Sequence, residues 1–93
     1  MIDEYTFSEE KDHKLRNERG IGFKEIITYL ESGNIVDVIS HPNLKKYPQQ
    51  WYYMINIEGY IWAVPHEYRD GKIHLITAFQ NRKANKTYGK KKK

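Results

Sequence analysis

The stretch WYYMINIEGYIWAVPH, residues 51–66, decides the fold because it joins two strand-forming runs through a tight turn. Residues 51–57 and 60–66 are rich in aromatic and β-branched side chains, which favour strands. Glu58 and Gly59 between them have the length of a two-residue hairpin turn. The stretch therefore predicts an antiparallel β-hairpin.

Further strands are predicted on both sides of this hairpin. Asp70-Gly71 indicates a second tight turn, followed by KIHLITAF, residues 72–79, as the last strand. Before the hairpin, the β-branched run at residues 34–40 predicts one more strand, separated from it by a loop containing two prolines. The core of the fold is thus predicted to be a four-stranded, mainly antiparallel sheet.

Apolar spacing predicts one well-defined helix. Phe23, Ile26, Ile27 and Leu30 fall at positions i, i+3, i+4 and i+7, so they form one apolar face of a helix over residues 23–32. This face has to be covered by another element, and the sheet is the available partner. We expect the helix to pack on the sheet.

Two other helices are predicted from capping signals. Ser8 is a good N-cap for a helix over residues 9–19, which Gly20 then ends. Asn81 caps a short basic helix that starts at Arg82. The fold class is therefore α+β, with two N-terminal helices packed on the sheet and a short basic C-terminal helix.

Alternation assigns the faces of the strands only in part. It puts Ile73, Leu75, Thr77 and Phe79 on the face that the helices cover, and His74 on the uncovered side. In residues 60–66 the two faces are both apolar, so the buried face stays undecided. Near the N-terminus, Tyr5 and Phe7 alternate with polar neighbours, which predicts a short strand or an extended lead-in segment.

Composition narrows the class of protein. The 93 residues fit a single domain, expected at residues 1–88 with a basic flexible tail at 89–93. The chain has no cysteine, and its four histidines lack ligand spacing, so neither a metal site nor a cofactor is expected. No apolar run approaches the roughly 20 residues of a membrane span, and Met1 is followed by acids rather than a secretory signal. We expect a cytoplasmic protein.

The positive charge is concentrated at one end of the chain. Residues 1–81 hold nine Lys and Arg against twelve Asp and Glu, whereas residues 82–93 hold seven cations and no acid. On a helix, Arg82 and Lys86 are four residues apart, so the cations repel one another. A bound phosphate would relieve this repulsion, which favours a polyanion partner. The alternative is a solvated basic tail.

Several motifs occur in an order that resembles the BrnT-type toxins of bacterial toxin–antitoxin pairs, which are relatives in fold of the RelE ribonucleases. In the N-terminal half they are FSEEK, residues 7–11, and ERGIGFKE, residues 18–25. In the C-terminal half the last strand runs into RKA, residues 82–84. The resemblance covers most of residues 5–88.

A closely similar branch of small proteins also carries HPN, YP and an ending like RKA-x-K-x-Y, which match residues 41–43, 47–48 and 82–88. The resemblance implies a fold of two helices and four strands, and metal-independent cleavage of RNA. It also implies a hetero-oligomer with a cognate antitoxin, often a ribbon-helix-helix DNA-binding protein. BrnT-type sequences carry a glutamate a few residues after Arg-Lys-Ala, whereas residues 82–93 hold no acid.

Cleavage of RNA through its own 2′-hydroxyl needs a base, an acid and cations that stabilise the charge on phosphorus. Arg82 and Lys83 suit the cationic role. His66 and His74 titrate in the range for proton transfer, and both could share a cleft with Arg82 if they face the open side. Tyr88 is a further proton donor near the same helix. The alternative for each histidine is a half-buried place on its strand.

Lys86 is expected to bind the RNA backbone, and the aromatic rings of Trp62 and Tyr60 to stack on a splayed base. The predicted function is an endoribonuclease toxin that arrests growth. One alternative is a nucleic-acid-binding module without catalysis. Another is a protein-interaction domain whose lysine tail only increases solubility.

Overall fold

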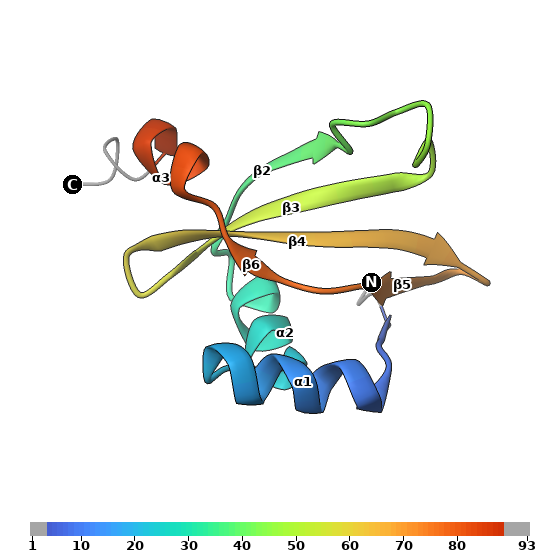
Figure 1. Cartoon of the computed structure of the whole chain (residues 1–93), viewed down its shortest axis with the longest axis horizontal. Coiled ribbons are helices and arrows are strands. Elements are labelled where there is room, and N and C mark those ends of the chain that lie inside the picture. Colours follow the sequence, from blue (N-terminus) through green and yellow to red (C-terminus); the bar gives the residue numbers. More distant parts are fainter. Residues whose placement is uncertain (1–3, 89–93) are drawn as a thin grey trace.

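The computed structural model describes residues 4–88, with Tyr88 described by its backbone only, as an α+β fold (Figure 1). Its elements in chain order are β1 (Tyr5–Thr6), α1 (Glu9–Arg19), α2 (Phe23–Glu31), β2 (Ile35–Ser40), β3 (Gln50–Ile57), β4 (Tyr60–Arg69), β5 (Lys72–Leu75), β6 (Phe79–Gln80) and α3 (Arg82–Tyr88). The fold class and the positions of the three helices agree with the prediction. The expected tail at residues 89–93 lies outside the described residues.

Within residues 4–88 the sheet has six strands, two more than predicted. The strand order is β1-β5-β4-β3-β2, and β6 pairs with β4. β1 runs parallel to β5, whereas the other pairs are antiparallel, so the sheet is mixed. The predicted count of four was wrong because Tyr5–Thr6 joins the sheet and because the predicted last strand is divided.

The division of the last strand follows from one extra residue. His66 pairs with Leu75, and Ala63 pairs with Phe79, so two residues of β4 face the three residues 76–78. An extra residue in one strand moves the following side chains to the opposite face. Ala78 therefore lies in the core beneath the helices, and Phe79 lies on the other face. The predicted faces are right for Ile73 and Leu75 and wrong for Phe79.

Both predicted hairpin turns are present. Glu58 and Gly59 have φ angles of 51° and 91°, and Ile57 pairs with Tyr60 across the turn. A turn with two positive φ angles matches the twist of paired strands, and glycine adopts such an angle without strain. The second turn lies at Asp70-Gly71. β4 continues up to this turn and ends at Arg69, beyond the predicted end at residue 66.

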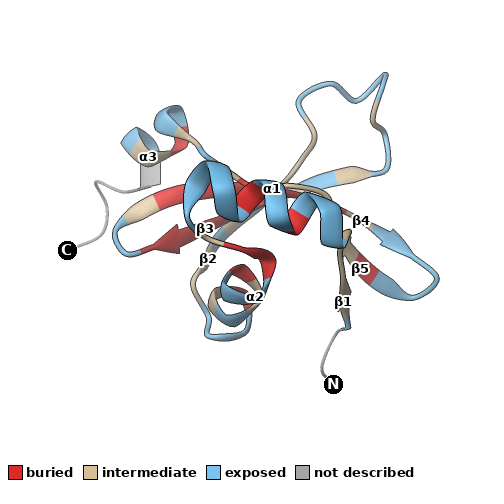
Figure 2. Ribbon diagram, turned by 60° about the horizontal axis from the view of Figure 1, so that its bottom comes forward, coloured by how far each residue is buried: buried red, intermediate tan, exposed pale blue. Residues whose placement is uncertain are grey.

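One face of the sheet is covered by α1 and α2 (Figure 1). Phe23, Ile26 and Leu30 of α2 and Leu15 of α1 form a buried cluster with apolar side chains of the central strands. Figure 2 shows that α1 is exposed over most of its surface, as its single strongly apolar residue predicts. Most of the burial that holds the helical layer on the sheet therefore comes from α2.

A buried carboxylate joins the two helices. Asp12 of α1 accepts a hydrogen bond of 2.7 Å from the amide of Phe23, which opens α2, and its other oxygen is 3.2 Å from Arg16 Nε. Burial by itself would raise the pKa of Asp12, but the bonds from Phe23 and Arg16 outweigh it and lower that pKa. Asp12 thus acts as an ionised cap for α2 from a distant position in the chain.

The opposite face of the sheet carries α3 (Figure 1). Ala84 of α3 packs against Met54, Ile61 and Ala63 in a second, smaller buried cluster. The other described helices lie on the far side of the sheet, so α3 covers only one end of this face. We call this face the open face.

Candidate nucleic-acid interface

Two asparagines attach α3 to the edge of β4. The Asn81 amide donates to the Ile61 carbonyl over 3.0 Å, and the Ile61 amide donates to Asn85 Oδ1 over 3.1 Å. Asn81 Oδ1 also accepts a hydrogen bond of 2.9 Å from the amide of Ala84, which confirms its predicted role as a cap. The basic helix is therefore a docked element with a defined orientation on the sheet.

Four aromatic side chains cross the open face as a continuous series, which we call the aromatic row: Tyr47, His41, Tyr52 and Phe79. The ring centroids are 4.5 Å apart for Tyr47 and His41, 5.1 Å for His41 and Tyr52, and 5.9 Å for Tyr52 and Phe79. All four residues are partly exposed. Ring edges and faces that remain open to solvent in this way are suited to stacking with nucleobases.

The backbone fixes the orientation of His41 within the row. The amide of Asn43 donates to His41 Nδ1 over 2.9 Å, so Nδ1 is the acceptor and the ring hydrogen lies on Nε2. This bond lies within the loop that follows β2, as the proline-containing sequence predicts. Next to His41, burial together with the charge of Tyr47 raises the pKa of the Tyr52 phenol.

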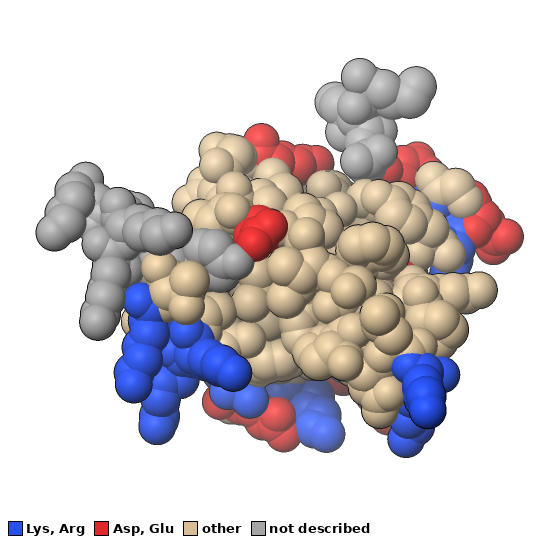
Figure 3. Space-filling model, turned by 90° about the horizontal axis from the view of Figure 1, so that it is seen from above, with Lys and Arg blue, Asp and Glu red and all other residues tan. Residues whose placement is uncertain are grey.

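The cations of α3 lie beside the aromatic row. Arg82, Lys83 and Lys86 are exposed, and no ion pair joins any of them to a carboxylate among residues 4–88. Figure 3 shows Lys and Arg side chains gathered at the α3 end of the open face, whereas its middle carries none. Positive charge without a protein counter-charge next to an aromatic surface is the arrangement that single-stranded nucleic acid requires.

The structure separates the two predicted catalytic histidines. His66 lies on the face beneath the helices, 1% exposed, with its ring stacked on Tyr53 at 3.7 Å and Nδ1 donating to the Val64 carbonyl. His74 pairs with Glu67 on the opposite face and shares a hydrogen bond of 2.9 Å with Thr6. The expected common cleft is therefore not formed, because His66 faces the core.

Burial lowers the pKa of both histidines. For His66 the hydrogen bond to Val64 opposes this effect without cancelling it, so its pKa is lowered. For His74, burial and the nearby Arg69 lower the pKa, while Glu67 acts in the opposite direction. The neutral imidazole is favoured in each case.

His74 is also far from α3. Gln80, just before α3, pairs with Trp62, whereas His74 pairs with Glu67, five residues further along β4. At the usual rise of a strand this separation is about 17 Å. The structure therefore brings Arg82 and Lys83 together on α3 without bringing either predicted histidine to them.

The two predicted stacking aromatics lie on the covered face. Trp62 is 6% exposed within the core under the helices, and Tyr60 packs at the edge of the same core. The expectation that Trp62 is exposed was wrong because its neighbours Ile61 and Ala63, not Trp62, face α3. The side chain of Tyr88 lies outside the described part of the structure.

The aromatic row was missed from the sequence. Tyr52 and Tyr53 are adjacent, and alternation alone does not tell which of them faces the helices. The HPN and YP motifs, which contain His41 and Tyr47, were interpreted only as family features within a loop. Phe79 was assigned to the wrong face because the extra residue at 76–78 leaves no mark in the pattern of apolar residues.

No family model matches the chain, no curated protein matches it, and no solved structure matches it. In the described range, no three His, Asp or Glu side chains are grouped so that they could hold a metal ion. The helices of that range are also too short or too polar to cross a membrane.

Proposed function

We propose that this protein binds single-stranded RNA across its open face. The observation that carries the proposal is the aromatic row of Tyr47, His41, Tyr52 and Phe79 next to the exposed cations of α3. Bases would stack on the rings, and phosphates would be bound by Arg82 and Lys86. Stacking of one base on an aromatic side chain contributes about 1–3 kcal/mol.

We further propose that the protein is the toxin of a toxin–antitoxin pair, of BrnT type and RelE-like fold, acting in the cytoplasm. Support comes from the motif order and from the two N-terminal helices on one face of the sheet with a basic helix after its last strand. The substrate would be RNA, cleaved without a metal ion by attack of its 2′-hydroxyl. A cognate antitoxin, such as a ribbon-helix-helix protein, would bind and inhibit it.

In such a reaction Arg82 and Lys83 would stabilise the charge that develops on phosphorus. Proton transfer on the open face would fall to His41, the histidine of the aromatic row, once its Nδ1 releases the Asn43 amide and can accept the 2′-hydroxyl proton. His41 lies toward the end of the row remote from α3, because its amide donates to Gln50, which pairs with Glu67. His66 is buried behind the sheet, and His74 pairs with Glu67, away from α3. Tyr88 would serve as the second proton-transfer group.

The second candidate is RNA binding without cleavage. It is favoured because His66 and His74 are separated from the cations of α3, so neither predicted proton-transfer group lies beside them. His41 is the histidine in the aromatic row. The same surface would then bind RNA without forming a product. If the open face instead binds a protein, the affinity of this face for RNA would be negligible.

Binding is tested by fluorescence anisotropy with a labelled 12-nucleotide RNA. We expect Tyr52→Leu and Phe79→Leu each to weaken binding about tenfold, the equivalent of roughly 1.4 kcal/mol. Tyr68→Leu is the matched control because Tyr68 is exposed on the opposite face. Equal affinity in all three variants and the wild type would exclude the open face as the RNA site.

Cleavage is tested separately, in EDTA, with analysis of product ends for a 2′,3′-cyclic phosphate. Arg82→Ala should reduce the rate about tenfold to a thousandfold, and His41→Gln should reduce cleavage at saturating protein far more than it weakens binding, because it removes the proton-transfer group together with one ring of the row. Expression in bacteria should arrest growth in the wild type only. Intact RNA at saturating protein, with normal binding, would select the non-catalytic candidate.

A further inference from the structure

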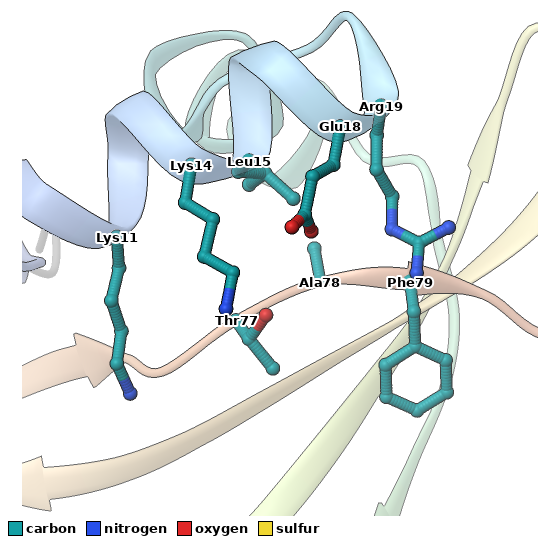
Figure 4. A pocket seen from close by; sticks show the side chains of 8 residues that line it. All are labelled: Lys11, Lys14, Leu15, Glu18, Arg19, Thr77, Ala78 and Phe79. Atoms are coloured by element: carbon teal, nitrogen blue, oxygen red, sulfur yellow. The ribbon is translucent and has the colours of Figure 1, made fainter.

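A second cationic surface lies on the other side of β6. Lys11, Lys14 and Arg19 extend from α1 toward residues 77–79 and line a groove with a volume of about 350 Å³ (Figure 4). Leu15 and Ala78 form the apolar part of its wall. The groove thus runs between the first helix and the edge of the sheet.

The charge of this groove is not balanced by the protein. Glu18 is the acid among its lining residues, against three cations, and none of the three cations forms an ion pair within residues 4–88. Arg16, on the same helix, is instead paired with Asp12 and Glu25 at 3.2 and 3.3 Å. On one side of α1, Arg16 is neutralised by two carboxylates. On the side that faces the groove, the three cations have no ion-pair partner among residues 4–88.

The backbone opposite these cations belongs to the irregular segment between β5 and β6. Neither Thr77 nor Ala78 donates its amide to any described residue, although the neighbouring amide of Ile76 donates to Pro65 and that of Asn81 to Ile61. Ala78 is 2% exposed. The regular ladder with β4 is therefore interrupted where the chain lines the groove.

Phe79 connects the groove to the aromatic row. It belongs to the lining of the groove, and its ring lies on the open face, 5.9 Å from the ring of Tyr52. A strand of RNA with one base stacked on Phe79 would cross the sheet edge at β6 and continue directly into the groove. Its phosphates would then meet the three cations of α1.

We infer that the groove between α1 and residues 77–79 binds the phosphate backbone of the same RNA strand whose bases stack on the aromatic row. This inference rests on the proposed function and extends its site from the open face around the sheet edge. Lys11 and Arg19 are eight residues apart, so the cations cover about 12 Å of the helix axis. They can contact successive phosphates of one strand.

The test compares two triple variants that change net charge equally. Lys11→Ala/Lys14→Ala/Arg19→Ala removes the groove cations, and Lys24→Ala/Arg69→Ala/Lys72→Ala removes three exposed cations elsewhere. Binding of a labelled 12-nucleotide oligouridylate is measured at several salt concentrations. Each lost phosphate contact reduces the magnitude of the slope of log affinity against log salt by about 0.7 for single strands. The slope of the groove variant should therefore be smaller in magnitude by about 2 than that of the wild type.

Affinity of the groove variant should fall at least tenfold more than that of the control variant. If both triple variants weaken binding equally while Phe79→Leu still weakens it, the groove inference is wrong and the open-face site stands. If neither the groove variant nor Phe79→Leu changes affinity, both proposals are wrong. Thermal unfolding of each variant is recorded to verify that it is folded at the assay temperature.

Discussion

Replacement of Asp12 tests the contact that orients the two helices. Its carboxylate accepts a 2.7 Å hydrogen bond from the Phe23 amide, and Phe23 is fully buried. The amides in the first turn of a helix have no backbone acceptor of their own. In Asp12→Ala the Phe23 amide would remain buried without a partner.

The expected cost follows from this one bond. A buried donor left unsatisfied costs about 1–3 kcal/mol, and loss of an N-cap costs about 0.5–2 kcal/mol. These ranges describe the same interaction, so we expect Asp12→Ala to lower the free energy of unfolding by about 2 kcal/mol. For a domain of this size that corresponds to a fall in Tm of roughly 8–16 °C.

Asp12→Asn separates the hydrogen bond from the charge. The amide oxygen can still accept from Phe23, but a neutral acceptor is roughly half as strong as a charged one, so the cost should be about 1 kcal/mol. The folded state lowers the pKa of Asp12. The stabilisation by its charge is therefore complete above the unfolded value near 3.9 and is lost as pH falls through the folded value.

The assay is urea unfolding followed by tryptophan fluorescence, because Trp62 lies in the core. It is run at pH 7 and at pH steps down to about 2, because the charge stabilisation is lost only below the unfolded pKa, with Glu18→Ala as an exposed control on the same helix. The difference in the free energy of unfolding between the wild type and Asp12→Asn should become smaller at the lowest pH values. A cost for Asp12→Ala no larger than that of the control, or a gap independent of pH, would refute the reasoning.

Three further outcomes are expected. Asn85→Ala removes the acceptor of the buried Ile61 amide, so it should cost about 1–3 kcal/mol and speed hydrogen exchange at Ile61. His66→Phe should preserve the stack on Tyr53 and reduce the loss of stability in urea titrations as pH falls below about 6.5, because burial lowers the pKa of His66 and the unfolded chain takes up the proton first. Gly20→Ala should cost about 1 kcal/mol in thermal unfolding, because Gly20 ends α1 with a φ of 75°.

Local signals in the sequence were sufficient for the helices and the hairpin turns. The helix predicted over residues 9–19 matches α1, and the apolar face over residues 23–32 ends one residue past α2. Both hairpin turns are also where their glycines indicate. Capping, periodicity and positive φ act over a few residues, so a single sequence carries them in full.

The assignment of faces depended on contacts between distant segments. β4 is apolar on both sides because α1 and α2 cover one face and Ala84 of α3 covers part of the other. A strand buried on both faces has no alternation to interpret. Trp62 was therefore placed with the RNA-binding residues and His66 with the catalytic residues, although both belong to the core face.

The break at residues 76–78 links the fold to both proposed binding surfaces. Without the extra residue, Phe79 would face the helices, and β5 would continue its ladder with β4 through residues 76–78. With it, the Phe79 ring reaches Tyr52 on the open face, while Ala78 lies beneath the helices and lines the groove beside α1. A ladder irregularity of this kind costs hydrogen bonds, and such features are common next to functional sites because they re-aim side chains. Since one irregularity places the stacking ring on one side of the edge and a wall of the cationic groove on the other, a single strand of RNA that meets both accounts for it more simply than two unrelated ligands.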